Sequence, residues 1–220
     1  MPACLDAIQK QEASGLELEV ILTDGGSTDR TVALGKEAGV DVVMESTSSR
    51  GAQLYAGAEL AQGDVLLFLH ADGLLPKNAF CAIEHAIAQG HAAGAFAVKH
   101  VLSEQAGPLV QRLVGIADAR SRKTSMPYGD QAVFVTTSAY RAVGGMPQQP
   151  LMEDLEFAKR LSQSVRFHLL PEVVKTSARR FEQRPIRSVL CWWSFPTLYR
   201  WGVSPQRLMK MYGHPRATRK

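Results

Sequence analysis

The sequence predicts an α/β fold in which a doubly wound, mostly parallel sheet carries helices on both faces. In the first half of the chain, short apolar runs alternate with helical patterns across short connections, the order typical of βαβ units. The run at 65–69 is almost continuously apolar, as in a parallel strand that is buried on both faces. Ligands of such sheets bind at the carboxyl ends of the strands, so polar residues that follow an apolar run are the first candidates for a site.

Each element follows from its local pattern. Apolar runs predict strands at 18–23, 40–44, 65–69, 93–101, 131–135 and 173–177. Helical patterns lie at 28–38, 52–61, 76–88, 108–122 and 152–162. Pro76 suits the first turn of the third of these helices. In the last, the apolar residues at 152, 155, 158 and 161 share one face.

The start of the chain differs from that of most doubly wound folds, which open with a buried strand. Residues 1–8 have a helical pattern instead. We expect either a fold that begins with a helix or a chain that starts at a later Met. In the second case, the coding region upstream encodes the first strand in frame.

Composition excludes several classes of protein. At 45% hydrophobic and 21% charged residues, the chain can bury a sizeable core. Its three cysteines form no C-x-x-C pair, which disfavours a disulfide framework or a zinc site and suits a reducing cytoplasm. It has neither an apolar run of about 18 residues nor a signal-peptide pattern. We therefore expect a cytoplasmic protein. We also expect no nucleic-acid partner.

Charge divides the chain into an acidic and a basic part. Residues 1–174 hold 14 Lys and Arg against 20 Asp and Glu, whereas residues 175–220 hold 11 against the single Glu182. We expect one α/β domain at 1–184 and a basic, aromatic-rich helical segment at 185–220, which contains all three tryptophans. This segment either covers the protein's own sheet or a partner in a homodimer, or it binds the anionic inner face of the cell membrane.

Residues 24–29, with the sequence DGGSTD, follow a predicted strand and open a predicted helix. Gly25 and Gly26 allow a tight turn, and Ser27 or Thr28 can cap a helix whose first amides favour anions. Asp24 would project from the strand end toward a base or ribose. A plain capped turn is the alternative. The pattern is neither G-x-G-x-x-G nor a P-loop, which disfavours dehydrogenases and P-loop enzymes.

Two acidic segments could carry chemistry. Asp72 ends His70-Ala71-Asp72 after the most apolar strand, and a carboxylate there, together with diphosphate oxygens, suits Mg²⁺ or Mn²⁺. Glu153 and Asp154 open a helix, where they either complement its dipole or supply a general base.

Two further polar segments complete the candidates. Asp130 and Gln131 follow Gly129 ahead of an apolar strand. Arg179 and Arg180 precede an aromatic residue and could clamp a phosphate, or could be ordinary surface charge.

In their order, these segments resemble the family 2 glycosyltransferases of the GT-A fold, and especially the small branch known as radical-SAM/selenodomain-associated transferases. The matching stretches are DGGSTD (24–29), RGAQLYAGA (50–58), GDVLLFLHAD (63–72), YGDQAVFV (128–135), GG (144–145), LMEDLEFAKRL (151–161) and SARRF (177–181). The resemblance covers nearly the whole chain. Tyr55 and Gly73 depart from the family's common Asn and Thr, and the first strand is missing.

The resemblance also implies a role for each matched residue. Asp24 would contact the donor's base, with Gly25, Ser27, Arg50, Gln53 and Ala71 also on the nucleotide-sugar side. Asp72 would bind the metal, Mg²⁺ or Mn²⁺. Asp154 would be the catalytic base, with Glu153 beside it. Asp130 and Gln131 would line the acceptor side, and Arg179 and Arg180 would lie near the diphosphate.

The implied reaction is a single inverting displacement of a nucleotide diphosphate by an acceptor hydroxyl, which a lipid could carry. Two alternatives stay open. A sugar-phosphate nucleotidyltransferase shares the fold class but normally needs a basic, glycine-rich loop near the N-terminus, which is not visible here. A non-catalytic module that binds nucleotide sugars would be consistent with the missing strand.

Overall fold

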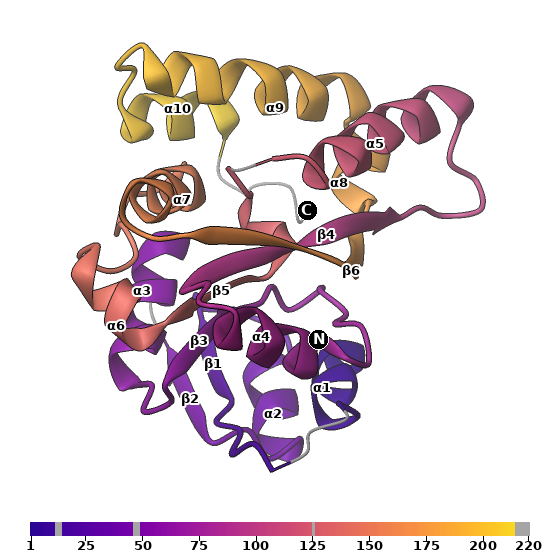
Figure 1. The fold of residues 1–220 in the computed structure, drawn as a ribbon. Helices are drawn as coiled ribbons and strands as arrows, with labels where there is room; N and C mark the ends of the chain where they lie inside the picture. The colour runs from indigo at the N-terminus through magenta and orange to yellow at the C-terminus, as the bar shows by residue number, and fades with distance from the viewer. Residues whose placement is uncertain (12–14, 46–48, 125, 214–220) are drawn as a thin grey trace.

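The computed structural model describes residues 1–11, 15–45, 49–124 and 126–213 (Figure 1). Its strands are β1 (Ile21–Asp24), β2 (Val42–Glu45), β3 (Val65–Phe68), β4 (Ala93–Val101), β5 (Val133–Thr136) and β6 (Phe167–Ser177). Its helices are α1 (Pro2–Gln9), α2 (Thr31–Glu37), α3 (Arg50–Leu60), α4 (Ala79–Ala88), α5 (Pro108–Ser121), α6 (Thr137–Ala142), α7 (Glu153–Ser164), α8 (Arg179–Gln183), α9 (Pro185–Arg200) and α10 (Pro205–Tyr212), with a 3₁₀ turn η1 at Gly129–Gln131.

The strands form a sheet of four and a separate pair. The larger sheet has the order β3-β5-β4-β6, and β1 pairs with β2 in parallel. Strands β4 and β6 are also parallel, but β5 runs antiparallel to both of its neighbours, so the main sheet is mixed rather than mostly parallel as the sequence predicted. The reason lies in the connection: α5 packs back along β4 and η1 lies beside the middle and end of that strand, so the chain runs back along β4 and β5 pairs with its first residues, Ala93 and Gly94.

Helices cover both faces of the four-stranded sheet, as the sequence predicts. Val133 and Val135 of β5 point into one core with residues of α6 and α7, against which α3 packs. Phe134, between them, points into the other core with α4, against which α1 packs through Ile8. The alternation follows from the two-residue period of a strand. The α/β class with helices on both faces is therefore confirmed.

Several element starts differ from the sequence predictions. Helix α2 begins at Thr31 rather than at 28, so neither Ser27 nor Thr28 caps it, and the Oδ1 of Asp29 instead accepts the Thr31 amide. Helix α4 begins at Ala79 rather than at Pro76. Strand β5 begins at Val133, because the residues before it form η1. The opening helix is present as α1, and no described residue precedes it with a strand.

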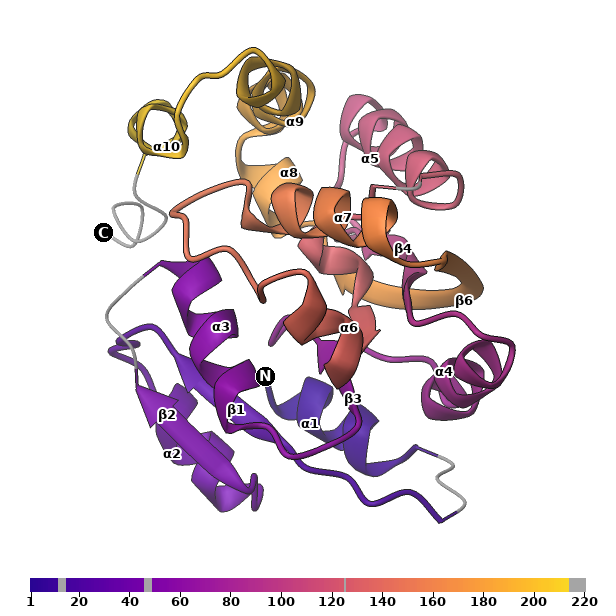
Figure 2. The same cartoon turned by 60° about the vertical axis from the view of Figure 1, so that its left-hand side comes forward.

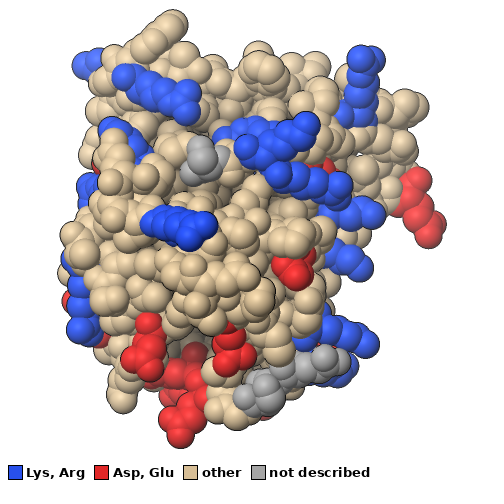
Figure 3. Space-filling view, viewed as in Figure 1, with Lys and Arg blue, Asp and Glu red and all other residues tan. Residues whose placement is uncertain are grey.

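Helices α5, α9 and α10 lie together at one end of the molecule, and β1, β2 and α2 lie at the opposite end (Figures 1 and 2). Helix α9 is anchored to α7 because the Tyr199 hydroxyl donates to Oε2 of Glu156 at 3.1 Å. In the face shown in Figure 3, Lys and Arg side chains predominate toward the end formed by α9 and α5, and several acidic side chains gather at the opposite end.

Candidate active site

The start of α7 presents two carboxylates. The residue before them, Met152, has φ +65° and ψ 19°, which turns the chain sharply into the helix. Asp154 is fixed at both oxygens: Oδ2 accepts the Gly129 amide at 2.9 Å and Oδ1 accepts the Leu155 amide at 2.8 Å. Its side chain remains 18% exposed. A carboxylate that is fixed in position and still partly exposed can contact a ligand.

Arg50, the first residue of α3, joins both carboxylates. Its Nε lies 2.9 Å from Oε1 of Glu153, and its Nη2 lies 3.6 Å from Oδ2 of Asp154. Burial raises the pKa of Glu153, against the opposing charge of Arg50. Burial also disfavours the Arg50 cation, but the charges of Glu153 and Asp154 outweigh it and raise the pKa of the guanidinium. The site therefore contains a cation bound between two acids.

Two glycines leave room for the close packing around Arg50. A Cβ on Gly129 would collide with the Arg50 guanidinium, and a Cβ on Gly51 would collide with the carbonyl oxygen of Pro147. Both positions therefore need a residue without a side chain. This explains the glycines in the RGAQ and YGDQ segments in physical terms.

His70 lies just beyond β3 and beside this cluster. It lines a small hollow with Arg50, Gly129 and Asp154. Its Nε2 is buried and has no hydrogen-bond partner among the described residues. Burial, followed by the charge of Arg50, lowers the pKa of His70 to about 3, so the ring is neutral near pH 7. A neutral ring with a free nitrogen can donate to or accept from a ligand, depending on its tautomer.

Asp72 lies on the turn after β3, where both it and Ala71 are exposed. No described residue donates a hydrogen bond to its carboxylate, and no group of three or more His, Cys, Asp or Glu within the described ranges could hold a metal ion. Mg²⁺ is commonly held by one or two carboxylates together with phosphate oxygens and water. An exposed, unpaired carboxylate at the end of β3 fits that mode of binding.

The DGGSTD segment forms a turn at the carboxyl end of β1. Asp24 is only 4% exposed, and its Oδ2 accepts the amides of Gly26 and Ser27 at 2.7 and 2.6 Å. Gly26 has φ +80°, a conformation that glycine adopts without strain. The carboxylate therefore organises the turn itself. Helix α3, which carries Arg50 and Gln53, packs on β1 and connects this turn to the acidic cluster.

Sequence reasoning missed a second cluster on the other side of Asp130. Nδ1 of His100, in β4, lies 2.6 Å from Oδ1 of Asp118, and its Nε2 lies 3.4 Å from Oδ2 of Asp130. Burial opposes the imidazolium, but hydrogen bonds to the two carboxylates raise the pKa of His100 to about 9. Burial likewise opposes ionisation of Asp130, and the hydrogen bond from His100 outweighs it, which lowers the pKa of Asp130.

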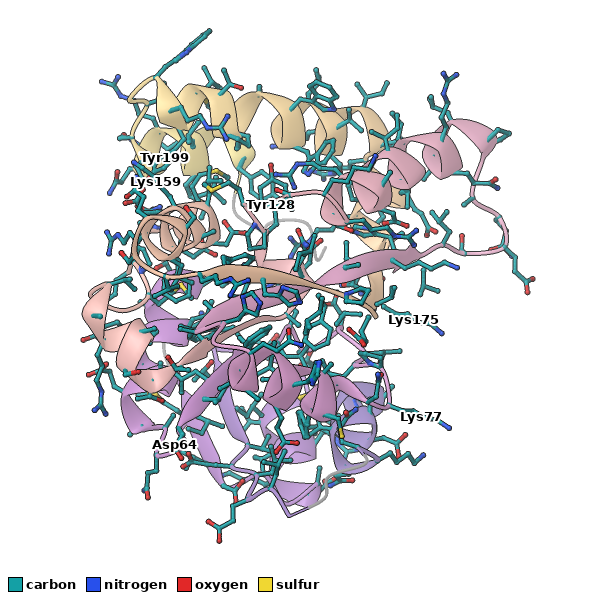
Figure 4. All side chains as sticks on the ribbon, viewed as in Figure 1. Asp64, Lys77, Tyr128, Lys159, Lys175 and Tyr199 are labelled. Atoms are coloured by element: carbon teal, nitrogen blue, oxygen red, sulfur yellow. The ribbon has the colours of Figure 1, made fainter. Side chains whose placement is uncertain are left out.

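A cavity of about 80 Å³ adjoins this cluster, with Asp130 and His100 in its wall. Tyr128 and Trp192 of α9 also line this cavity. The Arg120 guanidinium, another lining group, lies 4.1 Å from the ring centre of Tyr128. Figure 4 places Tyr128 beneath the layer of α9 and α5. The amide of Gln131 has a structural function, since Nε2 donates to the carbonyl oxygens of Phe96 and Ser121.

The structure thus brings five of the predicted residues into two linked groups: Arg50, Glu153 and Asp154 in one, and Asp130 and Gln131 in η1 beside it. Arg179 and Arg180 open α8 as exposed residues. The charge of Arg180 reaches His70, where it also lowers the pKa of the ring.

The model of the family described as Glycosyl transferase family 2 matches residues 1–140, more than half of the chain. The chain belongs to glycosyl transferase family 2. Among curated relatives, a PGL/p-HBAD biosynthesis glycosyltransferase of Mycobacterium bovis is 37% identical over 81 residues, which cover 34% of this chain and 31% of that protein. A protein of the same name from Mycobacterium tuberculosis matches equally well. The match thus spans about a third of these relatives.

Solved structures support the same fold. TarS 1-349 of S. aureus has a TM-score of 0.62 at 16% identity, covering 86% of this chain and 59% of that one. The mannosyltransferase PcManGT from Pyrobaculum calidifontis, solved with GDP-Man and Mn²⁺, has a TM-score of 0.65 at 18% identity, covering 92% of this chain and 61% of that one. Likeness at this level of identity shows the fold, and the family 2 chain therefore has the GT-A glycosyltransferase fold that its motifs predict.

Proposed function

We propose that this family 2 chain transfers a sugar from a nucleotide-diphosphate donor to an acceptor hydroxyl, with inversion at the anomeric carbon and with Mg²⁺ or Mn²⁺. The observation that carries the proposal is Asp154: its carboxylate is fixed by the Gly129 amide, stays partly exposed, and lies beside Arg50 and His70. Complexes of the structural neighbours with UDP-GlcNAc and with GDP-Man and Mn²⁺ support the class of donor.

The donor side of the proposal uses the ends of β1 and β3. The turn organised by Asp24 lies at the end of β1, where a base or ribose would bind. Asp72 would hold the metal ion beside the diphosphate, and Arg180 lies close enough for its charge to act on His70. When bound, the metal ion would supply positive charge that stabilises the leaving diphosphate.

On the acceptor side, Asp154 removes the proton. The acceptor O–H bond breaks and its proton passes to Asp154, while the oxygen forms a bond to the anomeric carbon. The bond from that carbon to the diphosphate breaks, and its electron pair leaves with the diphosphate. Arg50 holds the Asp154 carboxylate in position before the transfer. Asp130 and the aromatic cavity beside it would receive the acceptor.

The proposal is tested by calorimetry with a panel of UDP- and GDP-sugars, with and without Mn²⁺. We expect binding of at least one donor to depend on Mn²⁺ and to lose that dependence in Asp72→Ala. Asp64→Ala is the matched control, because Asp64 is exposed and precedes β3, at the other end of that strand from Asp72 (Figure 4). Unchanged metal-assisted affinity in Asp72→Ala would remove Asp72 from the metal site.

Two further readouts separate the alternatives. Nuclear magnetic resonance of the product gives the anomeric configuration, which must be opposite to that of the donor for an inverting enzyme. A sugar-phosphate nucleotidyltransferase would instead release pyrophosphate from a nucleoside triphosphate and a sugar phosphate. Donor binding without turnover across a panel of acceptors would favour the non-catalytic module.

A further inference from the structure

The outer faces of α5, α9 and α10 expose an unusual amount of apolar surface. Of the eleven large hydrophobic residues exposed in the described parts of the chain, seven belong to these three helices and the cap of α9. They are Leu109, Ile116, Ile186, Leu190, Trp193, Trp201 and Met211. On soluble proteins, exposed apolar residues that gather in one region often mark an interaction site.

Helix α9 has two distinct faces. Ile186, Leu190 and Trp193 are spaced i, i+4 and i+7, so they lie on one face, and they are 69%, 62% and 65% exposed. The opposite face packs inward: Phe195 is buried, and Trp192 closes the aromatic cavity. The apolar outer stripe therefore lies mostly outside the protein's own core.

The charge of this end layer is almost entirely positive. Helices α5, α9 and α10 contain a single acid, Asp118, which points inward to His100. Arg112, Arg200, Arg207 and Lys210 are exposed on the same helices. Figure 3 shows Lys and Arg side chains around this end of the molecule.

We propose that the outer face of α5, α9 and α10 docks on an anionic lipid bilayer. Indole rings such as those of Trp193 and Trp201 favour the boundary between lipid and water, and basic side chains are drawn to anionic headgroups. No helix in the described part of the chain is long and apolar enough to cross a bilayer, so the contact lies in the surface plane.

The charge pattern favours a bilayer over a second copy of the chain. A two-fold contact through this face would bring the same basic residues of both copies together, and like charges across an interface oppose association. An anionic bilayer can bury the apolar stripe and also attract the basic residues to its headgroups. Helix α9 carries both this face and Trp192, which lines the cavity beside Asp130, so an acceptor held in the membrane would lie close to that cavity; this extension rests on the proposed function.

The test is flotation of the full chain with vesicles of phosphatidylglycerol and phosphatidylcholine at low salt, compared with pure phosphatidylcholine. We expect binding only to the anionic vesicles, with a blue shift of tryptophan emission. Arg207→Gln with Lys210→Gln should weaken binding about 30-fold. Leu190→Ser with Trp193→Ser should weaken it by at least about tenfold.

Matched controls use exposed residues elsewhere. Lys77→Gln with Lys175→Gln removes two charges away from this layer (Figure 4), and Leu18→Ser with Leu60→Ser removes two exposed apolar side chains. Absent binding to anionic vesicles, or equal losses in the controls, would overturn the proposal. So would a dimer by light scattering that Leu190→Ser with Trp193→Ser dissociates. Calorimetry of donor binding by the same variants shows whether the proposed function fails independently of membrane binding.

Discussion

Replacing Arg50 by Met tests whether the ion pair with Glu153 holds the site together. Methionine keeps much of the apolar stem of arginine but removes its charge. The Glu153 side chain is only 4% exposed and would lose its cation, whereas Asp154 would keep the Gly129 amide. The variant should therefore fold with a buried, unpaired carboxylate beside an intact Asp154.

The expected loss follows from burial. Breaking a buried ion pair typically costs about 3 to 5 kcal/mol. Because the Arg50 side chain is 37% exposed, water already screens part of the attraction, and we expect about 2 to 3 kcal/mol. In a chain of 220 residues this lowers Tm by roughly 5 to 10 °C.

Urea unfolding of the wild type, Arg50→Met, Glu153→Gln and the double variant measures the coupling. The double variant should recover about 1 to 2 kcal/mol of unfolding free energy relative to the sum of the single losses. Burial raises the pKa of Glu153, so the stranded carboxylate takes up a proton as pH falls and the deficit of Arg50→Met should shrink in acid. Strictly additive losses, or a deficit that does not change with pH, would refute the reasoning.

Three other variants probe the site. Asp154→Asn should lower turnover by about 10²-fold or more with little change in donor affinity, measured by steady-state kinetics and calorimetry, and retained turnover would leave Asp154 only a capping role. Gly129→Ala should destabilise the fold by about 1 to 3 kcal/mol through its clash with Arg50, so an unchanged Tm in scanning calorimetry would contradict the packing. The pKa of His100 is raised from 6.5 to about 9, so its stabilisation is complete below pH 6.5 and is lost as pH rises through about 9. His100→Gln should therefore unfold more easily than the wild type in urea at low pH, by up to about 3 kcal/mol, with the gap closing toward pH 9; a constant gap would exclude the charged pair.

Local patterns predicted most of the secondary structure. The strand at 93–101 and the helix beginning at Pro108 have the expected starts, because an apolar run and an N-terminal proline are local signals. The predicted start of α4 at Pro76 was wrong because a contact with a distant strand holds the preceding residues. Leu74 pairs with Lys175 of β6 (amide to carbonyl oxygen 2.7 Å), and this long-range pairing keeps the chain extended up to Pro76, where a turn leads into the helix (Ala79 amide to Pro76 carbonyl oxygen, 3.1 Å). The direction of β5 depends equally on where α5 returns the chain.

The sequence predicted which residues could carry chemistry better than it predicted how they meet. Arg50, Glu153 and Asp154 were all candidates, but their ion pairs join segments far apart in sequence and leave no local signal. His100 was missed because one polar residue at the end of an apolar strand is ordinary. Its significance depends on Asp118, which the following helix brings to its Nδ1.

Backbone strain at the site is a further property that composition alone does not reveal. Among the described residues, only Ala132 and Met152 have positive φ without being glycine, at +45° and +65°. Each adjoins a candidate segment: Ala132 follows Asp130 and Gln131, and Met152 precedes Glu153. Such conformations cost of order 1 to 3 kcal/mol each and persist only where the surroundings enforce them. Here the enforcing contacts are those of the site itself, since the Gly129 amide ties η1 to Asp154 and Arg50 ties α3 to Glu153. The strained turns and the ion pairs therefore support one another, and both hold Asp154 in a fixed position with one side open.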